Sequence, residues 1–390
     1  MGEGKPESAT PTPFTYENEI YAAGLSDQRP QISFDATKWE SLARERLPAD
    51  SFGYVWGSAG TRETDENNRA AFRKWGIVPS RLVEADFPSL KTRLFGEEYD
   101  YPIALAPVGV QRIFHREGEI AVARAAAQAG VTYTLSTAAS ASIEDVARAN
   151  DTGGDNGDGS RWYQLYWPSN EHNDITASLL NDLDHGYNPF LIPDNIGVEI
   201  GFSDPVFQRH FQEKHGISIE EDVLTAAREW ARIMFPGKSH GWRDIQFLRE
   251  HWDGPIVLKG IHSVSDAKKA RDAGVQGIVV SNHGGRQQDG GVGSLDVLPE
   301  IVDELGNDVE VIFDSGVRCG ADVVKALALG AKMVLLGRPY VYGLAIAGEQ
   351  GVRHVLRSIL GDLQLTLHLS GIPDVNRENL NSSVLRRTSG

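Results

Sequence analysis

Short apolar segments alternate with helix-like segments along most of this 390-residue sequence, and this alternation constrains the fold more than any other feature. The apolar segments are Tyr101 to Val108, Val131 to Thr137, Trp162 to Trp167, Pro255 to Ile261, Gly277 to His283, Glu310 to Gly316 and Met333 to Pro339. Most are continuously apolar, which is typical of parallel strands buried on both faces. The pattern therefore predicts a parallel sheet covered by helices.

The intervening segments have helical spacing. They are Gly118 to Gly130, Ser142 to Asn150, Ser263 to Gly274, Leu295 to Leu305 and Ala321 to Gly330. Several end in glycine, which is preferred just after a helix, and Ser142 and Ser263 are candidate N-caps. Such repeated β-α units form either an open doubly wound sheet or a closed barrel.

Polar residues or glycine at the C-terminal ends of almost all predicted strands favour the barrel. They are Ser136, Gln164, Tyr166, Lys259, Ser281, His283, Asp314, Gly337 and Arg338. A barrel brings its strand ends around one mouth, where the active sites of this fold lie, whereas an open sheet spreads them along an edge. We therefore predict an α/β chain with the TIM (β/α)₈ barrel fold.

The fourth strand of this barrel is atypical or missing. Its only candidate, Asn188 to Pro193, contains two prolines, and proline removes a hydrogen-bond donor from a central strand. Residues 194–240 are too long for a plain loop, so we predict a helical lid. Residues 1–13 have the composition of a disordered leader, and residues 14–390 are expected to form a single barrel domain.

The composition limits the partners of the chain. A formal net charge of −16 argues against binding to nucleic acid or to anionic lipid, both of which require a surplus of Lys and Arg. No apolar run approaches the roughly 20 residues that span a bilayer. The single cysteine, Cys319, cannot form an internal disulfide, so we expect a cytoplasmic protein whose partners are small molecules or other subunits.

Two predicted strand ends carry side chains suited to catalysis. His283 and Arg286 lie in the glycine-rich loop SNHGGRQ, where the His suits a base and the Arg suits binding of a carboxylate. The alternative is a solvated loop with a capping Arg. Lys259 interrupts the apolar run PIVLKGI and needs an anion, either a reduced flavin or a protein carboxylate.

Two further strand ends have the pattern of a phosphate site. DSGVR (314–318) and GRP (337–339) follow the last two predicted strands, where loops of this fold commonly bind phosphate through backbone N–H groups. Ordinary tight turns are the alternative for either segment alone, and the two in order are the stronger indication. Tyr54 and Tyr166 can each donate a hydroxyl to a substrate, although spacing alone favours packed core tyrosines.

Six motifs together, SNHGGRQ, VLKGI, DSGVR, LGRP, APVGV and YQLYW, resemble the FMN-dependent L-2-hydroxy-acid oxidase and dehydrogenase family. That family includes glycolate oxidase, lactate oxidase and flavocytochrome b2. The resemblance extends from about Phe14 to the C-terminus, apart from residues 180–200. The segment Tyr16 to Tyr21, and Gly109 where oxidases tend to have Ala, are most similar to the lactate 2-monooxygenase branch.

The resemblance implies a cofactor, FMN, and a role for each matching residue. His283 would be the base, Arg286 and Tyr54 would bind the substrate carboxylate, and Tyr166 would face the substrate hydroxyl. Lys259 would lie at the N1–O2 edge of the flavin. The other implied flavin-binding residues are Pro107, Val108, Gly109, Ser136, Gln164 and Ser281 at the ring and ribityl chain, and Asp314, Ser315, Gly316, Arg318, Gly337 and Arg338 at the tail and phosphate.

The chain departs from the family at the fourth strand. Members carry an Asp there that orients the catalytic His, and a second Arg that meets the carboxylate, and neither is present here. One alignment places a deletion between Asn181 and Asp182. The other uses Asn188 to Pro193 as the strand, with Asp194 as a surrogate orienting residue.

The implied function is oxidation of an L-2-hydroxy acid to the 2-oxo acid, as an oxidase or a lactate-monooxygenase-like enzyme with oxygen as acceptor. The alternative is a catalytically impaired FMN-binding barrel, and a flavin-dependent isomerase is disfavoured by SNHGGRQ and the two tyrosines. Ala138 and Ala139 indicate room for a bulky substrate side chain. Relatives are commonly tetramers or octamers, so a homo-oligomer is expected.

Overall fold

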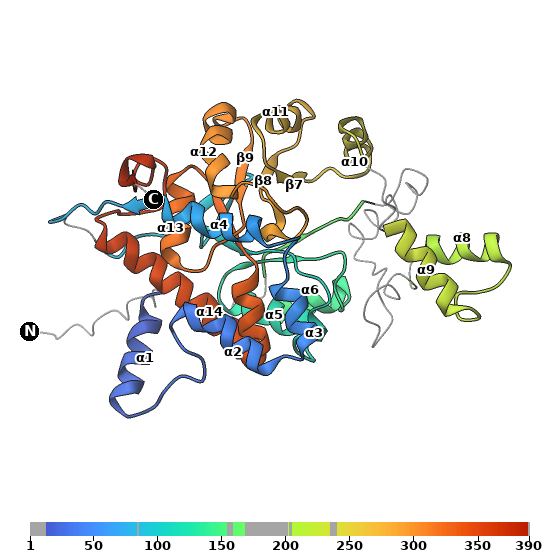
Figure 1. Ribbon diagram of the computed structural model, residues 1–390, viewed down its shortest axis with the longest axis horizontal. Helices are drawn as coiled ribbons and strands as arrows, with labels where there is room; N and C mark the ends of the chain where they lie inside the picture. The colour runs from blue at the N-terminus through green and yellow to red at the C-terminus, as the bar shows by residue number, and fades with distance from the viewer. Residues whose placement is uncertain are drawn as a thin grey trace, which may run out of the picture.

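The computed structural model describes residues 13–83, 86–153, 159–167, 202, 205–234 and 240–388 (Figure 1). Its central sheet contains β4 (Ile103–Leu105), β5 (Thr132–Leu135), β6 (Arg161–Tyr163), β7 (Val257–Ile261), β8 (Gly277–Val280), β9 (Glu310–Phe313) and β10 (Met333–Leu336). All neighbours are parallel, in the order β6-β5-β4-β10-β9-β8-β7. Because the first of these strands along the chain, β4, pairs with the last, β10, the sheet curls as in a TIM barrel. The predicted fold class is confirmed.

The two edges of this sheet are β6 and β7, which are consecutive strands along the chain. Within the described residues no strand lies between them. The gap falls where the fourth strand of the barrel belongs. Both sequence interpretations of that strand, residues 188–193 with Asp194 and a deletion between Asn181 and Asp182, concern positions outside the described residues.

The strands are apolar on both faces because each packs against two separate layers. Ala104, Ile312 and Met333 belong to one buried cluster together with Leu94 from the hairpin of β2 (Thr92–Leu94) and β3 (Glu97–Tyr99). Alternate residues of the same strands belong to the main cluster shared with the helices, for example Phe313. Side chains of a strand point alternately to its two faces, so continuous apolar runs follow from burial on both sides.

Helices surround the sheet. Those that follow strands are α5 (Gly118–Gln128), α6 (Ile143–Gly153), α11 (Val264–Asp272), α12 (Ser294–Leu305), α13 (Gly320–Ala328) and α14 (Arg338–Leu369). The predicted caps are confirmed, because Ser142 Oγ accepts a hydrogen bond from the backbone N–H of Asp145 at 3.0 Å and Ser263 Oγ accepts one from Asp266 at 3.1 Å. Among these described helices, none combines the length and apolarity needed to cross a membrane.

The N-terminal part precedes the barrel and contributes to its mouth. It contains α1 (Thr15–Leu25), α2 (Trp39–Arg46), α3 (Ala49–Trp56), α4 (Glu63–Arg73) and β1 (Trp75–Ile77). β1 pairs antiparallel with β11 (Leu385–Arg387), which ties this part to the end of the chain. The segment between α3 and α4 packs on the loop after β8, since Ala59 N–H donates to Gly285 O at 2.9 Å.

The region predicted to be a lid is helical where the structure describes it. It contains α8 (Pro205–His215) and α9 (Val223–Met234), and α10 (Ile245–His251) follows before β7. α8 and α9, on the right in Figure 1, share a separate hydrophobic cluster that includes Phe207, Phe211 and Trp230. Tyr166 is partly buried against this cluster. The lid role itself stays a prediction.

Candidate active site

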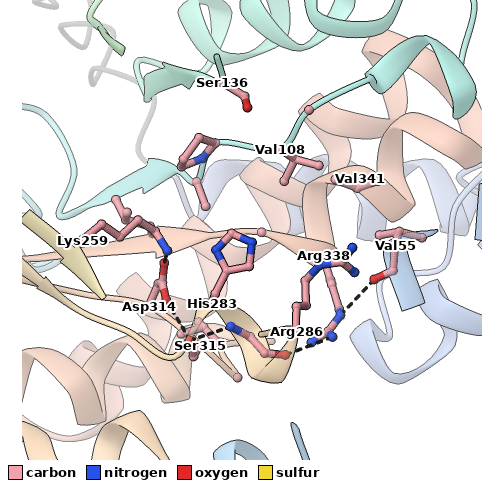
Figure 2. A pocket seen from close by; sticks show the side chains of 18 of the residues that line it. Val55, Val108, Ser136, Lys259, His283, Arg286, Asp314, Ser315, Arg338 and Val341 are labelled. Carbon is pink, nitrogen blue, oxygen red and sulfur yellow. Dashed lines mark hydrogen bonds and ion pairs between the residues drawn. The ribbon is translucent and has the colours of Figure 1, made fainter. Parts of the chain in front are cut away.

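A pocket of about 240 Å³ opens at the C-terminal ends of the strands (Figure 2). Its lining includes nearly all residues predicted for the site: Tyr54, Pro107, Val108, Gly109, Ser136, Tyr166, Lys259, His283, Arg286, Asp314, Ser315, Gly316, Arg318, Gly337 and Arg338. The other two lie directly behind it. Gln164 accepts a hydrogen bond from Ser136 Oγ at 2.9 Å, and Ser281 Oγ accepts one from Lys259 Nζ at 2.9 Å.

The loop after β8 presents His283 through an uncommon backbone turn. His283, Gly284 and Gly285 all have left-handed φ angles, of 58°, 67° and 74°. This backbone conformation is unfavourable for histidine, and non-glycine residues adopt it only where surrounding interactions stabilise it. Asn282 does so here, because its side chain accepts from Gly285 N–H at 3.1 Å and exchanges two hydrogen bonds of 2.8 Å with the amide of Asn68 on α4.

The imidazole of His283 is electrically neutral at ordinary pH. Burial, together with the positive charges of Lys259 and Arg286, lowers its pKa from 6.5 to about 4, although Asp314 acts in the opposite direction. A neutral imidazole has a free lone pair and is competent to accept a proton. Within the described residues no carboxylate forms a hydrogen bond with this ring, and Asp194, the surrogate orienting residue of one alignment, lies outside them.

Lys259 points into the pocket and pairs with a carboxylate there. Its Nζ lies 2.9 Å from Asp314 Oδ2, and Ser281 donates a short hydrogen bond to the same carboxylate. Burial alone would raise the pKa of Asp314, but Lys259 and the hydroxyl donors hold it below its ordinary value. The two alternatives for Lys259 do not exclude each other. The amine pairs with Asp314, and because this ion pair lines the pocket, Lys259 can also contact a bound flavin.

Arg286 and the two tyrosines lie together at another side of the pocket. The guanidinium of Arg286 lies 5.0 Å from the ring centre of Tyr54 and donates to the backbone carbonyls of Tyr54 and, at 3.0 Å, of Gly57. Burial lowers the pKa of Arg286, and burial together with Tyr54 raises the pKa of Tyr166. A half-buried guanidinium whose bonds are only to carbonyl oxygens retains its positive charge for an anionic ligand.

The segments predicted to bind phosphate converge at the far end of the pocket. Arg318 is buried and donates to the neighbouring Val317 carbonyl at 3.0 Å, with no carboxylate partner among the described residues. Burial and the charge of Arg338 lower the pKa of Arg318. Gly316 has φ 89°, and a Cβ there would lie 3.0 Å from the backbone oxygen of Asn68. A buried unpaired arginine beside a glycine turn fits the phosphate of FMN.

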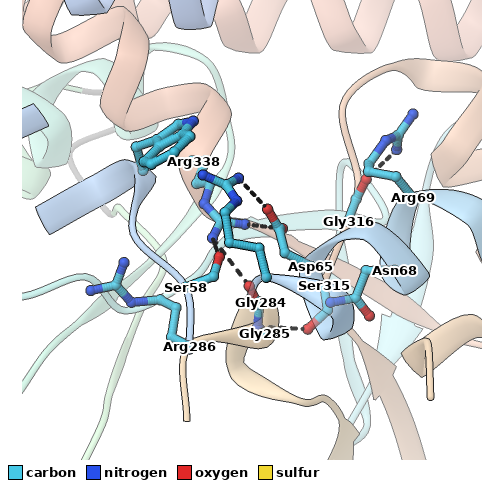
Figure 3. Close-up of polar contacts among 12 residues, drawn as sticks. Ser58, Asp65, Asn68, Arg69, Gly284, Gly285, Arg286, Ser315, Gly316 and Arg338 are labelled. Carbon is cyan, nitrogen blue, oxygen red and sulfur yellow. Dashed lines mark hydrogen bonds and ion pairs between the residues drawn. The ribbon is translucent and has the colours of Figure 1, made fainter. Parts of the chain in front are cut away.

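Two residues at this site were missed by sequence reasoning. Asp65 and Asn68 are on α4, and both are buried although they are polar. Asp65 forms an ion pair of 2.7 Å with Arg338 (Figure 3), and Asn68 holds Asn282. The sequence did contain an indication of their role. Asp65 and Asn68 lie on the same helix face as Phe72, and polar side chains on the apolar face of a helix need buried partners.

Ala139 differs in position from its neighbour. Ala138 lines the pocket, whereas Ala139 is buried in the main hydrophobic cluster. Only Ala138 therefore affects the room for a substrate side chain. Gly109 is adjacent, since a Cβ built there would lie 2.9 Å from both the Cβ and the carbonyl oxygen of Ala138.

Comparison with known proteins agrees with this site. Residues 43–387 match the family described as FMN-dependent dehydrogenase. An FMN-dependent alpha-hydroxy acid dehydrogenase of Schizosaccharomyces pombe is 58% identical over 96% of both chains. The L-lactate oxidase of Lysinibacillus sphaericus is 36% identical over 90% of this chain and 92% of its own. The crystal structure of a mandelate oxidase has a TM-score of 0.72 at 34% identity, covering 92% of this chain and 99% of that one.

The alignment lengths show that some positions of these relatives have no counterpart in this chain. The S. pombe alignment has 397 positions but covers 96% of 390 residues, or about 374, so about 23 positions of the relative face a gap here. The lactate oxidase alignment has 373 positions against about 351 residues, which leaves about 22.

The family match, the relatives and the pocket agree on the cofactor and on the class of reaction. The chain therefore belongs to the FMN-dependent dehydrogenase family, as an FMN-dependent oxidoreductase that acts on the CH–OH group of 2-hydroxy acids.

Proposed function

We propose that this protein oxidises an L-2-hydroxy acid with a bulky side chain to the 2-oxo acid and passes the electrons to oxygen. The single observation that carries the proposal is the neutral, buried His283 in one pocket with Arg286 and the Lys259–Asp314 pair. These groups supply a base, a cation for a carboxylate and a charged pair for a flavin. Together they match the needs of hydroxy-acid oxidation.

The residues that would hold FMN fit it. Arg318, Ser315 and Gly316 would bind the phosphate, with Gly337 and Arg338 beside them, because Arg318 is a buried cation without a carboxylate. The isoalloxazine ring would lie along Pro107, Val108 and Gly109, with Ser136, Gln164, Ser281 and Asp314 at its polar groups. When bound, FMN supplies the two-electron acceptor for the hydrogen at the substrate Cα.

The protein residues divide the remaining work. Arg286 and Tyr54 bind and orient the substrate carboxylate, and Tyr166 donates a hydrogen bond to the substrate hydroxyl. His283 Nε2 or Nδ1 takes the hydroxyl proton as the Cα–H bond breaks. The imidazolium so formed lies near Asp314, whose negative charge favours the protonated ring.

Two features support the acceptor and the substrate class. The relatives include proteins named L-lactate oxidase, 4-hydroxymandelate oxidase and 2-hydroxyacid oxidase 1, although the S. pombe relative is named a dehydrogenase. Ala138 and Gly109 place only a methyl group and a hydrogen on one wall of the pocket, which leaves space for an aromatic or branched side chain.

A second candidate, an FMN-binding barrel with impaired catalysis, rests on a specific observation. Among the described residues His283 has no carboxylate partner, and no described strand pairs with the free edges of β6 and β7. Loss of a carboxylate that orients a catalytic histidine lowers kcat by about 10⁴ in serine proteases.

The absorbance spectrum of the purified protein tests both candidates. We expect a bound-flavin spectrum that bleaches on anaerobic addition of L-mandelate, and more slowly with L-lactate, and hydrogen peroxide after air is admitted. Bound flavin that bleaches with neither acid would reject the first candidate in favour of the second. If the flavin bleaches but no hydrogen peroxide forms in air, oxygen is not the electron acceptor and another acceptor must be sought.

We also propose a homo-oligomer in the cytoplasm. Helix α1 contributes no buried residue, yet it exposes Tyr21 (71%) and Leu25 (75%). Exposed apolar side chains on one helix are typical of an interface with another subunit. Sedimentation velocity of the wild type and of Leu25→Glu tests this: the variant should sediment as a smaller species.

A further inference from the structure

The guanidinium of Arg338 is surrounded by acceptors from the protein (Figure 3). Its Nε donates to Val55 O at 3.1 Å, and its Nη2 lies 3.3 Å from Gly57 O, 3.2 Å from Ser58 Oγ and 3.1 Å from Gly284 O. Its Nη1 lies 2.7 Å from Asp65 Oδ1. Nearly all of its donors are therefore used within the protein, and only its charge remains for a ligand.

Asp65 is the only carboxylate among these partners in the described part of the chain. Its side chain is 9% exposed, and that of Arg338 is 10% exposed. Arg62 binds the other oxygen of Asp65 at 2.7 Å while its guanidinium lies 3.6 Å from the centre of the Trp56 ring. A buried ion pair with such supporting bonds is costly to break, because the partner left behind is a buried unpaired charge.

Arg338 joins two parts of the chain that both contribute to the lining of the pocket. Its partners Val55, Gly57 and Ser58 belong to the segment that begins with Tyr54, whereas Gly284 belongs to the loop of His283. The two parts are in close contact, since a Cβ on Gly285 would lie 2.6 Å from the backbone nitrogen of Asp65. Displacement of the guanidinium would therefore break the hydrogen bonds to residues 55–58 and to the loop of His283 at the same time.

We propose that Asp65 is a positioning residue for FMN: it holds Arg338 where the guanidinium both clamps residues 55–58 and contributes positive charge to the phosphate end of the pocket. This inference rests on the proposed function, which places the phosphate beside Arg318 and Arg338. The proximity of these two arginines is independent of it, since both line the same pocket.

The proposal predicts an effect opposite in sign to simple electrostatics. Removal of a negative charge near the phosphate should tighten FMN binding if charge alone mattered. If Asp65 positions Arg338, its removal should weaken FMN binding although the pocket becomes more positive. Riboflavin lacks the phosphate, so its affinity should change little in either case.

The experiment is fluorescence titration of the flavin-free protein with FMN and with riboflavin, for the wild type and for the variants Asp65→Asn and Asp65→Glu. We expect the Kd for FMN to rise about tenfold or more in Asp65→Asn, since truncation of one partner of a buried charge pair has at least this effect. Asp65→Glu keeps the charge but displaces it by one methylene, and its Kd should rise less. The riboflavin Kd should change by less than about twofold.

Glu66→Gln is the matched control, because Glu66 is the next residue on α4, is exposed and undergoes the same change of charge. It should bind FMN as the wild type does. Arg338→Met completes a double-mutant cycle: Asp65→Asn should cause no further loss in that background. In turnover, the clamp on the Tyr54 segment predicts a rise in KM for the hydroxy acid larger than the fall in kcat.

Each outcome is decisive. Unchanged or tighter FMN binding by both Asp65 variants overturns the inference, as does an equal loss of FMN and riboflavin affinity, which indicates general unfolding of the pocket. If Asp65→Asn does not fold, Asp65→Glu provides the test through the same two ratios of variant to wild-type Kd, one for FMN and one for riboflavin. A wild type that does not prefer FMN to riboflavin would instead refute the phosphate assignment in the proposed function, and the two failures are thereby distinguishable.

Discussion

Replacement of His283 by Gln should remove an acid sensitivity that is built into the pocket. In the folded protein the pKa of His283 is about 4 instead of 6.5, mainly because the ring is buried, and secondarily because Lys259 is close. Between pH 6.5 and pH 4 the unfolded chain therefore binds a proton at this residue that the folded chain does not. Stability rises with pH wherever the unfolded state binds more protons, so acidification through this window destabilises the fold.

The size of the effect follows from the two pKa values. The full difference corresponds to about 3 kcal/mol, reached below pH 4. On going from pH 8 to pH 5 the wild type should lose about 2 kcal/mol of unfolding free energy through His283 alone. The Gln variant keeps a polar side chain but cannot titrate, so it should be spared this loss.

Urea unfolding of the flavin-free protein at pH 8 and pH 5 measures the difference. The control is His251→Gln, which removes an exposed histidine on α10 and should retain the acid sensitivity of the wild type. The reasoning is refuted if wild type and His283→Gln lose the same free energy on acidification. The holoenzyme offers a second readout, because the acid limb of kcat/KM should lie near pH 4, and a limb near 6.5 would contradict the burial argument.

Three other substitutions probe the same pocket. Lys259→Met strands a buried carboxylate, so the free energy of unfolding should fall by about 3 kcal/mol in urea titrations, and a fall below about 1 kcal/mol would contradict the buried ion pair. Arg286→Lys should raise KM for the 2-hydroxy acid about tenfold or more, with a smaller effect on kcat, because an ammonium cannot bind a carboxylate as a planar fork does; steady-state kinetics at saturating oxygen would show it. Gly109→Ala places a methyl group 2.9 Å from the Cβ of Ala138 and should cost about 1–3 kcal/mol, partly restored by Ala138→Gly. Equal thermal stabilities of the single and double variants would refute that steric account.

The strands and the helix starts could be predicted from the sequence because each is encoded by residues that are close together along the chain. Continuous apolar runs predicted the seven strands, and serines at 142 and 263 predicted helix starts that the structure confirms. The strand-end rule for barrels then predicted that Lys259, His283 and Arg286 lie at one mouth. The atypical fourth strand, for which residues 188–193 were the candidate, lies outside the described residues and stays a prediction.

The contacts between side chains within the site could not be predicted from such local patterns. Asp65 and Arg338 are separated by 273 positions, and no periodicity links them. Ala138 and Ala139 are adjacent in sequence, yet one lines the pocket and the other the core, which depends on the path of the loop after β5. The pairing of Lys259 with Asp314 likewise requires two strands that are neighbours only through β8.

The sequence by itself thus determined the barrel and the residues at its mouth, because strand burial and strand-end chemistry are encoded within each β-α unit, and the resemblance of its motifs to a known family indicated the cofactor. Only the tertiary structure decided which charges neutralise one another and which remain for a ligand. Arg338 is bound to Asp65 and to backbone carbonyls, whereas Arg318 has no carboxylate partner among the described residues. That difference arises when the N-terminal segment folds across the strand ends, and it depends on distances in space that spacing along the chain does not specify.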